Sequence, residues 1–242
     1  MMRRKKTGKR ETQLTGSLAG GKKSSEAMVN NRYNPNITTE ELSGYDLSWF
    51  RGEIVLVDDI ETFHSVLPRL RRTDLLGFDT ETKPTFTRGR RNRVSLIQLS
   101  TDNLAVLFRI NKIGLPEELI RLLSDSSVTK AGVAIHDDIR FLKGVKKFSP
   151  DGFIDLQNFV REFGIESSGL KKMTAIVLGF RISKRQQVTD WEADKLSDAQ
   201  QIYAATDAWV CHQIYRKLTN GSLTPKPPRG GFRGQASPPW GI

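Results

Sequence analysis

The sequence predicts an α/β fold, an open mixed sheet flanked by helices in a single domain of residues 36–220. Three observations indicate this class. Strand-like runs alternate with helical patterns from residue 53 onward, and the pattern becomes wholly helical after about residue 155. The pair Thr101-Asp102 between two apolar runs suits a hairpin turn, so part of the sheet is expected to be antiparallel.

Strands are expected where short apolar or β-branched runs end at turn-forming residues. The runs that fit are residues 53–58, 75–80, 93–100, 103–108 and 128–133. The run 75–80 is short and apolar through Leu75, Leu76 and Phe78, which is typical of a buried strand, and it delivers Asp79 near its end.

Helices are expected where apolar residues recur every three or four positions. The segments with this pattern are residues 60–72, 115–123, 156–163, 169–178 and 198–218. Pro116 lies near the start of the second segment, where a helix tolerates proline. Another helix is expected to begin around Asp137 or Asp138, since an aspartate often caps a helix N-terminus.

The net charge of +11 belongs to the two ends of the 242-residue chain. Residues 1–30 hold eight basic and two acidic side chains, residues 216–242 hold five basic and none acidic, and the 25 basic and 25 acidic side chains between them cancel. We expect disordered basic tails over residues 1–35 and 221–242, the second rich in Pro and Gly. Basic tails support a polyanionic partner only weakly, because they are also common solubilising segments.

The composition excludes several classes of protein. Cys211 is the only cysteine, so no intramolecular disulfide is possible and a reducing compartment is favoured. The three histidines have no metal-ligand spacing, which argues against a zinc site of the Cys/His type. No run of 18 apolar residues occurs, so we expect a soluble, intracellular, cytoplasmic protein without a membrane span.

Acidic residues follow the predicted strand 75–80. Asp79 and Glu81 are one strand repeat apart and therefore point to the same side of the sheet. Two acids after a strand often do no more than begin a loop. Here the strand is buried, and ligands of open α/β sheets gather at such strand ends, so a functional site is the competing interpretation.

A second acidic pair, Asp137-Asp138, follows the strand ending near residue 133. Phe141 and Leu142 lie three and four positions after Asp138 and place its side chain on or beside the core-facing side of a helix, with Asp137 rotated away. Asp138 is therefore the candidate, although either residue fits a helix N-cap.

Tyr203 and Asp207 are four residues apart, one helical turn, so the phenol and the carboxylate project from the same helix face. A buried core tyrosine and a solvated aspartate are the ordinary alternatives. Gathering the Asp207 carboxylate with those of Asp79 and Glu81 would be very costly unless divalent cations neutralised their charges. The pattern therefore predicts a metal-dependent enzyme.

Together these residues resemble the 3′–5′ exonuclease family of the ribonuclease D-like group, which carries four acidic residues and a tyrosine (DEDDy), and the likeness is strongest to the exonuclease domain of the Werner syndrome protein. It spans roughly residues 53–218 and rests on their joint order and spacing. The motifs that carry it are Phe78-Asp79-Thr80-Glu81, residues 130–138, Gly169-Leu170-Lys171-Lys172, Trp191 and Tyr203-Ala204-Ala205-Thr206-Asp207-Ala208. The acidic pair at 137–138 departs from the single acid usual in the family.

The resemblance implies a ribonuclease H-like fold and hydrolysis of nucleic acid from its 3′ end to nucleoside 5′-monophosphates by two Mg²⁺ or Mn²⁺ ions. It also implies roles: Asp79 would bridge both ions, Glu81 and Asp207 would complete the site that activates water, Asp138 would support the second ion, and Tyr203 would orient the water. Hard carboxylate ligands suit such ions. Alternatives are a catalytically silent nuclease fold that only binds nucleic acid, and endonuclease or nucleotide phosphatase chemistry on the same metals.

The expected partner is nucleic acid with single-stranded 3′ ends, either DNA or RNA. Its phosphates are expected to meet the basic run after the first acids, although an exposed solvated loop is the ordinary interpretation of that run. The predicted substrate-binding residues are Thr80, Arg88, Arg90, Arg91, Arg93, Lys171 and Lys172. Lys184, Arg185 and Phe86 are weaker candidates.

Overall fold

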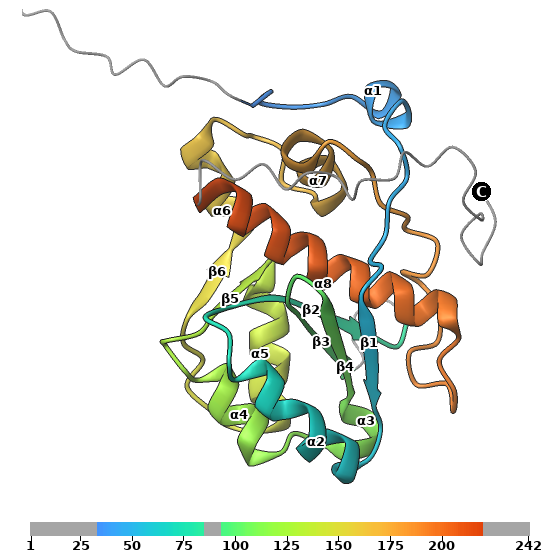
Figure 1. Ribbon diagram of the computed structural model, residues 1–242, viewed down its shortest axis with the longest axis vertical. Helices are drawn as coiled ribbons and strands as arrows, with labels where there is room; N and C mark the ends of the chain where they lie inside the picture. Colours follow the sequence, from blue (N-terminus) through green and yellow to red (C-terminus); the bar gives the residue numbers. More distant parts are fainter. Residues whose placement is uncertain (1–32, 85–92, 220–242) are drawn as a thin grey trace, which may run out of the picture. The chain divides into compact units, whose positions relative to one another are not determined.

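A single mixed sheet organises the computed structural model, which describes residues 33–84 and 93–219 (Figure 1). Within these residues six strands lie in the order β1-β4-β3-β2-β5-β6. The strands are β1 Glu53–Val57, β2 Leu75–Thr82, β3 Val94–Ser100, β4 Leu104–Arg109, β5 Thr129–Gly132 and β6 Phe153–Asp155. Strand β3 runs antiparallel to both β2 and β4, while β1 pairs with β4, and β5 with β2 and β6, in parallel. The predicted mixed sheet with an antiparallel hairpin is confirmed.

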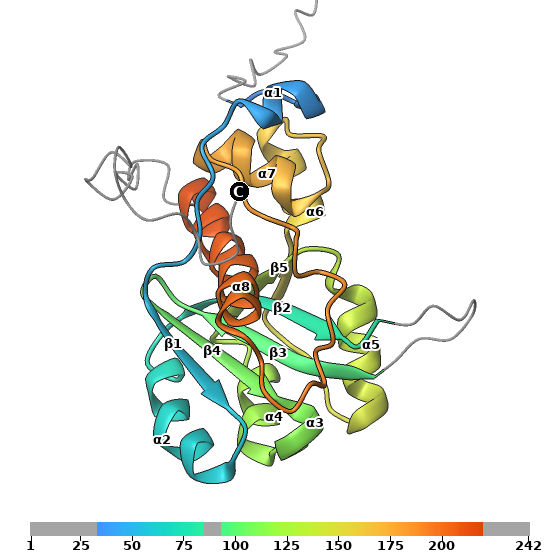
Figure 2. The same ribbon diagram turned by 90° about the vertical axis from the view of Figure 1, so that its right-hand side faces the viewer.

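The helices cover both faces of this sheet (Figures 1 and 2). On one face lie α2 Ile60–Leu70, α3 Ile110–Ile113, α4 Glu117–Leu123 and α5 Ile135–Val145, and on the other lies the long α8 Asp198–Thr219. The helices α6 Leu156–Phe159, η1 Val160–Phe163 and α7 Leu170–Leu178 pack beside the C-terminal half of α8. In the described part of the chain, no helix has both the length and the apolar character needed to cross a bilayer.

Alternation along β3 explains the two apolar layers. Every residue of β3 is buried, and Ile97 and Leu99 pack in the cluster of α2 and α4, whereas Leu96 packs against Tyr203 and Ala204 of α8. Successive strand side chains point to opposite faces, so a strand buried on both faces reads as a continuous apolar run.

Two predicted boundaries need correction. The helix expected around Asp137 or Asp138 begins at Ile135, and its N-cap is Ala134, so neither aspartate caps it. The helix expected over residues 156–163 is two pieces, the second of them a 3₁₀ helix. Strand β6 and the helix α1 Thr39–Ser43 were not among the predicted elements.

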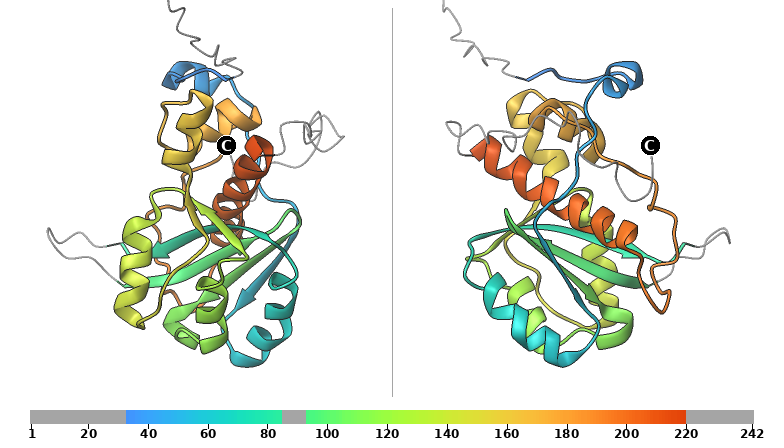
Figure 3. Two further views of the ribbon diagram at one scale, coloured as in Figure 1. Left: turned by 90° about the vertical axis from the view of Figure 1, so that its left-hand side faces the viewer. Right: turned by 45° about the vertical axis from the view of Figure 1, so that its right-hand side comes forward.

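Residues 33–52 form an N-terminal strap that passes α7 and crosses α8 before it enters β1 (Figure 3). Ile37 and Leu42 of the strap pack on Ala175 of α7. Near the end of the strap, the Phe50 backbone N–H donates to Thr206 Oγ1 of α8 at 3.0 Å. The strap therefore shields apolar surface on helices of the main fold.

Candidate active site

Three carboxylates from two elements meet at one point. Asp79 and Glu81 come from the last residues of β2, and Asp207 comes from the middle of α8. One oxygen of each lies within 4.8 Å of the others, a spacing that could hold a metal ion. The acids that the strand repeat and the helix repeat each placed on one face thus meet between the sheet and α8.

A close approach of α8 to β2 creates this convergence. A Cβ atom added at Gly77 would lie 1.8 Å from the Ala208 carbonyl oxygen, so only glycine fits there. Ala204, Ala205 and Ala208 are fully buried and keep the helix surface low. Gly77 is two residues before Asp79, and Ala208 directly follows Asp207. This contact therefore sets the separation of the two carboxylates.

Asp138 reaches the site from the opposite layer. Its Oδ1 accepts a hydrogen bond of 2.5 Å from Thr80 Oγ1, and Thr80 lies between the two acids of β2. Asp138 is not one of the three acids within 4.8 Å of each other, although its charge raises the pKa values of Asp79 and Glu81. Asp137 instead pairs with Arg140 at 3.1 Å, one helical turn along. Of the two neighbouring aspartates, Asp138 is the one beside the cluster.

Burial raises the pKa values of all these acids, and like charges add to the effect at Asp79, Glu81 and Asp138. Burial raises the pKa of Asp79 well above its usual value, and the charges of Asp207 and Asp138 add to the effect. Burial, followed by the charges of Asp79, Asp207 and Asp138, raises the pKa of Glu81 to about 10, and burial raises that of Asp207 to about 7. Desolvation and like charges both disfavour an ionised carboxylate, so the cluster is stabilised when it binds either protons or cations.

Tyr203 lies within this cluster as a hydrogen-bond donor. Its side chain is 5% exposed, hydrogen-bonds to Asp207 one turn along α8, and packs with its ring centroid 6.0 Å from that of the buried Trp191. Burial, followed by the charges of Asp207 and Glu81, raises the pKa of the phenol. The hydroxyl therefore stays protonated and cannot serve as a free base.

The donor set fits a hard divalent cation. All the converging atoms are carboxylate oxygens, the ligand type that Mg²⁺ and Mn²⁺ prefer. Asp207 Oδ1 is buried and has no hydrogen-bond partner among the described residues. A buried acceptor without a partner costs free energy, and a cation would supply the missing interaction. Asp79, Glu81 and Asp207 are therefore the candidate ligands, with Asp138 next to them.

The loop between α7 and α8, residues 179–197, borders the site and is tethered to the sheet. Lys83 pairs with Asp190 at 3.3 Å and with Glu192 at 3.8 Å, and Ser95 Oγ donates to Glu192 Oε1 at 3.1 Å. Figure 2 shows this loop running beside α8 toward the ends of β2 and β3. These contacts hold the loop against the end of β2 and the start of β3, near the point where the carboxylates converge.

One basic side chain of this loop, Lys184, acts on the carboxylates. The positive charge of Lys184 lowers the pKa values of Asp79 and Asp207, so Lys184 is close enough to act on the cluster. Burial lowers the pKa of Lys171 in α7, and so do the neighbouring charges of Arg181 and Lys184. Lys171, Arg181 and Lys184 thus lie near one another, and the charge that acts on the acids is that of Lys184, which had only weak support in the sequence.

The other predicted substrate contacts are distributed differently. Arg88, Arg90, Arg91 and Phe86 lie outside the described residues, and Arg93 is exposed directly before the start of β3. Arg185 is also exposed. Two candidates bind protein groups: the Thr80 hydroxyl donates to Asp138, and Lys172 Nζ donates to Asn36 Oδ1 at 3.3 Å.

Gln98 is a residue at the site that the sequence did not single out. It is the cross-strand partner of Asp79, so both side chains share the face that α8 covers. Gln98 is fully buried, and neither Nε2 nor Oε1 has a hydrogen-bond partner in the described part of the chain. Side chains alternate between the two faces of the predicted strand 93–100, and pairing this strand with β2 would have placed Gln98 beside Asp79.

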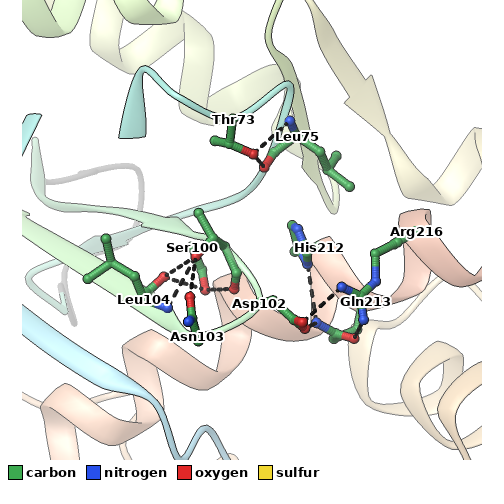
Figure 4. Close-up of polar contacts among 10 residues, drawn as sticks. Thr73, Leu75, Ser100, Asp102, Asn103, Leu104, His212, Gln213 and Arg216 are labelled. Carbon is green, nitrogen blue, oxygen red and sulfur yellow. Dashed lines mark hydrogen bonds and ion pairs between the residues drawn. The ribbon is translucent and has the colours of Figure 1, made fainter. Parts of the chain in front are cut away.

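Polar contacts at the far end of α8 anchor the β3–β4 hairpin to the helix (Figure 4). Gln213 Nε2 donates to Asp102 Oδ1 at 2.7 Å, and Arg216 pairs with Asp102 Oδ2 at 2.9 Å. His212 Nδ1 lies 3.2 Å from Gln213 Nε2, and burial lowers the pKa of His212 to about 4. This anchor holds α8 over the sheet about two turns beyond Asp207.

Comparison with known proteins agrees with this geometry. Residues 54–221 match a family model described as 3′–5′ exonuclease. The chain is 34% identical over 158 residues to the mouse bifunctional 3′–5′ exonuclease/ATP-dependent helicase WRN, covering 63% of this chain and 11% of that protein. It is 35% identical over 156 residues to the Drosophila melanogaster exonuclease 3′–5′ domain-containing protein 2, covering 63% of this chain and 26% of that protein. The chain thus spans only a small part of these curated relatives.

Solved structures show the same fold. The EXO domain of Aedes aegypti Nibbler superposes with a TM-score of 0.63 at 27% identity, covering 73% of this chain and 94% of that one. Escherichia coli RNase D superposes with a TM-score of 0.62 at 27% identity, covering 71% of this chain and 45% of that one. The predicted ribonuclease H-like class is confirmed by these neighbours.

Proposed function

Because the chain belongs to the 3′–5′ exonuclease family, we propose that it is a phosphodiester hydrolase that releases nucleoside 5′-monophosphates from the 3′ end of a nucleic acid. The observation that carries this proposal is the convergence of Asp79, Glu81 and Asp207 within 4.8 Å. Tyr203 beside Asp207 and Asp138 beside Thr80 complete the set of five side chains expected for the family.

We propose that Asp79, Glu81 and Asp207, supported by Asp138, hold two divalent cations, Mg²⁺ or Mn²⁺. When bound, such cations would activate the attacking water and neutralise charge on the scissile phosphate. The residues of the chain contribute placement: β2 and α8 present their carboxylates at a fixed separation, and the protonated Tyr203 hydroxyl is available to orient the attacking water. Preorganised groups of this kind lower the barrier without rearranging during the reaction.

We propose that the substrate backbone lies along the basic side of the site. Lys184 and Lys171, with Arg93 and the predicted Arg88, Arg90 and Arg91, would contact phosphates, and Thr80 and Lys172 remain predicted substrate contacts. Lys184 is best supported, because its charge already acts on Asp79 and Asp207. A cation there would balance the negative charge of a phosphate entering an acidic site.

A labelled-strand assay tests the activity. The protein should shorten a 5′-labelled single strand into a ladder with Mg²⁺ or Mn²⁺ and leave it intact with EDTA. Asp79→Asn and Asp207→Asn should each lower turnover at least about 100-fold, as expected for lost metal ligands. Asp198→Asn is the matched control, because Asp198 is exposed at the start of the same helix. Full activity in either ligand variant would refute the proposal.

Tyr203→Phe separates the role of the hydroxyl from that of the ring. It should reduce turnover about 100-fold while the Mn²⁺ affinity changes little, because the carboxylates remain. A matched set of DNA and RNA strands should then identify the sugar preference. Internal fragments in place of mononucleotides would indicate endonuclease chemistry, and tight binding without cleavage would indicate a silent nuclease fold.

A further inference from the structure

The turn between β5 and α5 is unusually tight and lies next to the site. The chain leaves β5 at Gly132 and enters α5 at Ile135, so Val133 and Ala134 make the whole connection. A Cβ atom at Gly132 would come within 2.5 Å of Ile135 Cγ2 and 2.7 Å of the Phe78 carbonyl oxygen. The end of β5 is therefore packed tightly between the start of α5 and the residue that precedes Asp79.

Ala134 adopts a conformation that its side chain disfavours. Its φ of 56° and ψ of 34° are left-handed, and among the described residues it is the only non-glycine with a positive φ. L-residues other than glycine, asparagine and aspartate rarely occupy this region, because Cβ approaches the following carbonyl group. Ala134 is also the N-cap of α5 and offers no side-chain cap. A contact from outside the turn would offset the cost of the left-handed conformation of Ala134.

Asp155 supplies that stabilising contact. It is the last residue of β6, paired in register with Gly132, and its Oδ1 accepts a hydrogen bond from the Ala134 backbone N–H at 3.2 Å. The same oxygen caps α6 by accepting from the Gln157 N–H at 2.9 Å. One carboxylate oxygen thus links the starts of α6 and α5.

The start of α5 determines where Asp138 lies. Asp138 is four residues, about one turn, after Ala134, and its Oδ1 accepts the 2.5 Å bond from Thr80. A change in the backbone of Ala134 would rotate or shift this first turn, since a helix is rigid along its axis. A displacement of 1 Å at a catalytic group can reduce the rate about 100-fold.

We propose that Asp155 is a positioning residue that holds Ala134 in the left-handed conformation and thereby sets Asp138 beside Thr80. This inference rests on the proposed function of the Asp79 cluster, and Asp155 itself does not contact the reacting atoms. The competing explanation is that Asp155 serves only as the N-cap of α6.

Asp155→Ser distinguishes these explanations. Serine is a good N-cap and preserves the hydrogen bond from the Gln157 N–H. Its side chain is one bond shorter than that of aspartate, so its hydroxyl no longer accepts from the Ala134 N–H. We expect turnover to fall about 10- to 100-fold with little change in KM. Asp155→Asn keeps Oδ1 as an acceptor and should retain turnover within about threefold.

Rescue by glycine gives the sharpest test. Adding Ala134→Gly to Asp155→Ser should recover about tenfold of the lost turnover, because glycine adopts the left-handed conformation without strain. Asp59→Ala is the matched control, since Asp59 caps α2 through the Thr62 N–H at 2.8 Å. That variant should lower Tm and leave turnover per folded molecule unchanged.

Hydrogen exchange of residues 135–142, measured without metal, provides a readout that needs no catalysis. Faster exchange in Asp155→Ser, reversed by Ala134→Gly, would support the positioning role even if the wild-type protein cleaved no strand. Wild-type turnover in Asp155→Ser, or a loss that glycine at 134 does not reverse, would overturn it and leave the proposed activity standing.

Discussion

Replacing Gly77 with alanine should separate the two halves of the candidate site. The new methyl group would lie 1.8 Å from the Ala208 carbonyl oxygen, whereas a close carbon–oxygen contact needs about 3.3 Å. Helix α8 must therefore move away from β2 by roughly 1.5 Å, the difference between these distances. Overpacking of this kind typically costs about 1–3 kcal/mol in the free energy of unfolding. It would also carry Asp207 away from Asp79.

Two measurements on Gly77→Ala check these consequences. Thermal unfolding should show Tm lower by about 2–12 °C, from the overpacking cost and the usual shift per kcal/mol for a domain of this size. Turnover of a 5′-labelled strand should fall about 100-fold or more, since a shift of 1 Å can have that effect. Gly144→Ala in α5 is the control, because a Cβ there meets nothing within 4 Å.

The result that would refute this reasoning is specific. Gly77→Ala with wild-type Tm and turnover within about threefold would show that α8 and β2 adjust without separating the carboxylates. A lower Tm with unchanged turnover would show that the contact stabilises the fold but does not set the spacing of Asp79 and Asp207.

Further predictions follow from the charges. The pKa of His212 is lowered to about 4 from 6.5, so its contribution to stability is full above pH 6.5 and is lost as the pH falls to about 4. Urea unfolding should show a loss of up to about 3 kcal/mol in the free energy of unfolding over this range, and His212→Gln should remove this pH dependence. Because the pKa of Asp207 is raised to about 7, Mn²⁺ must displace protons; calorimetry in two buffers should detect their release, and affinity should rise between pH 6 and pH 8. Lys184→Ala should raise KM about tenfold and reduce the salt slope of binding by about 1, while Lys195→Ala on the same loop should do neither. Removing residues 1–32 and 220–242 should leave turnover within about twofold and flatten the salt dependence of nucleic-acid binding. The reason is that, as we propose, residues 36–220 perform the chemistry and the tails add affinity.

Local periodicity was sufficient to place the candidate ligands on common faces. Asp79 and Glu81 follow the strand repeat, and Tyr203 and Asp207 follow the helix repeat, so each pair could be placed on one face before any tertiary contact was known. Their convergence depends on Gly77 and Ala208, which no local pattern distinguishes from other small residues. The resemblance to a family supplied that step.

Elements that depend on distant partners were missed. Strand β6 has three residues, Phe153–Asp155, and exists because it pairs with β5. The start of α5 at Ile135 has no local capping signal, since its stabilising oxygen belongs to Asp155. Helix α1 is different: Thr38 and Glu41 form a capping box that is visible in the sequence and would have predicted it.

The N-terminal strap has a practical consequence for engineering this protein. The match to the family begins at residue 54, yet Pro35 already accepts hydrogen bonds from the Glu166 and Ser167 amides, and the Arg181 amide is bonded to the Asp46 carbonyl. A fusion joined at residue 54 would uncover the α7 surface under Ile37 and the slot that Phe50 fills on α8. Reporter domains should therefore be attached ahead of Tyr33, where the folded unit keeps its full apolar covering.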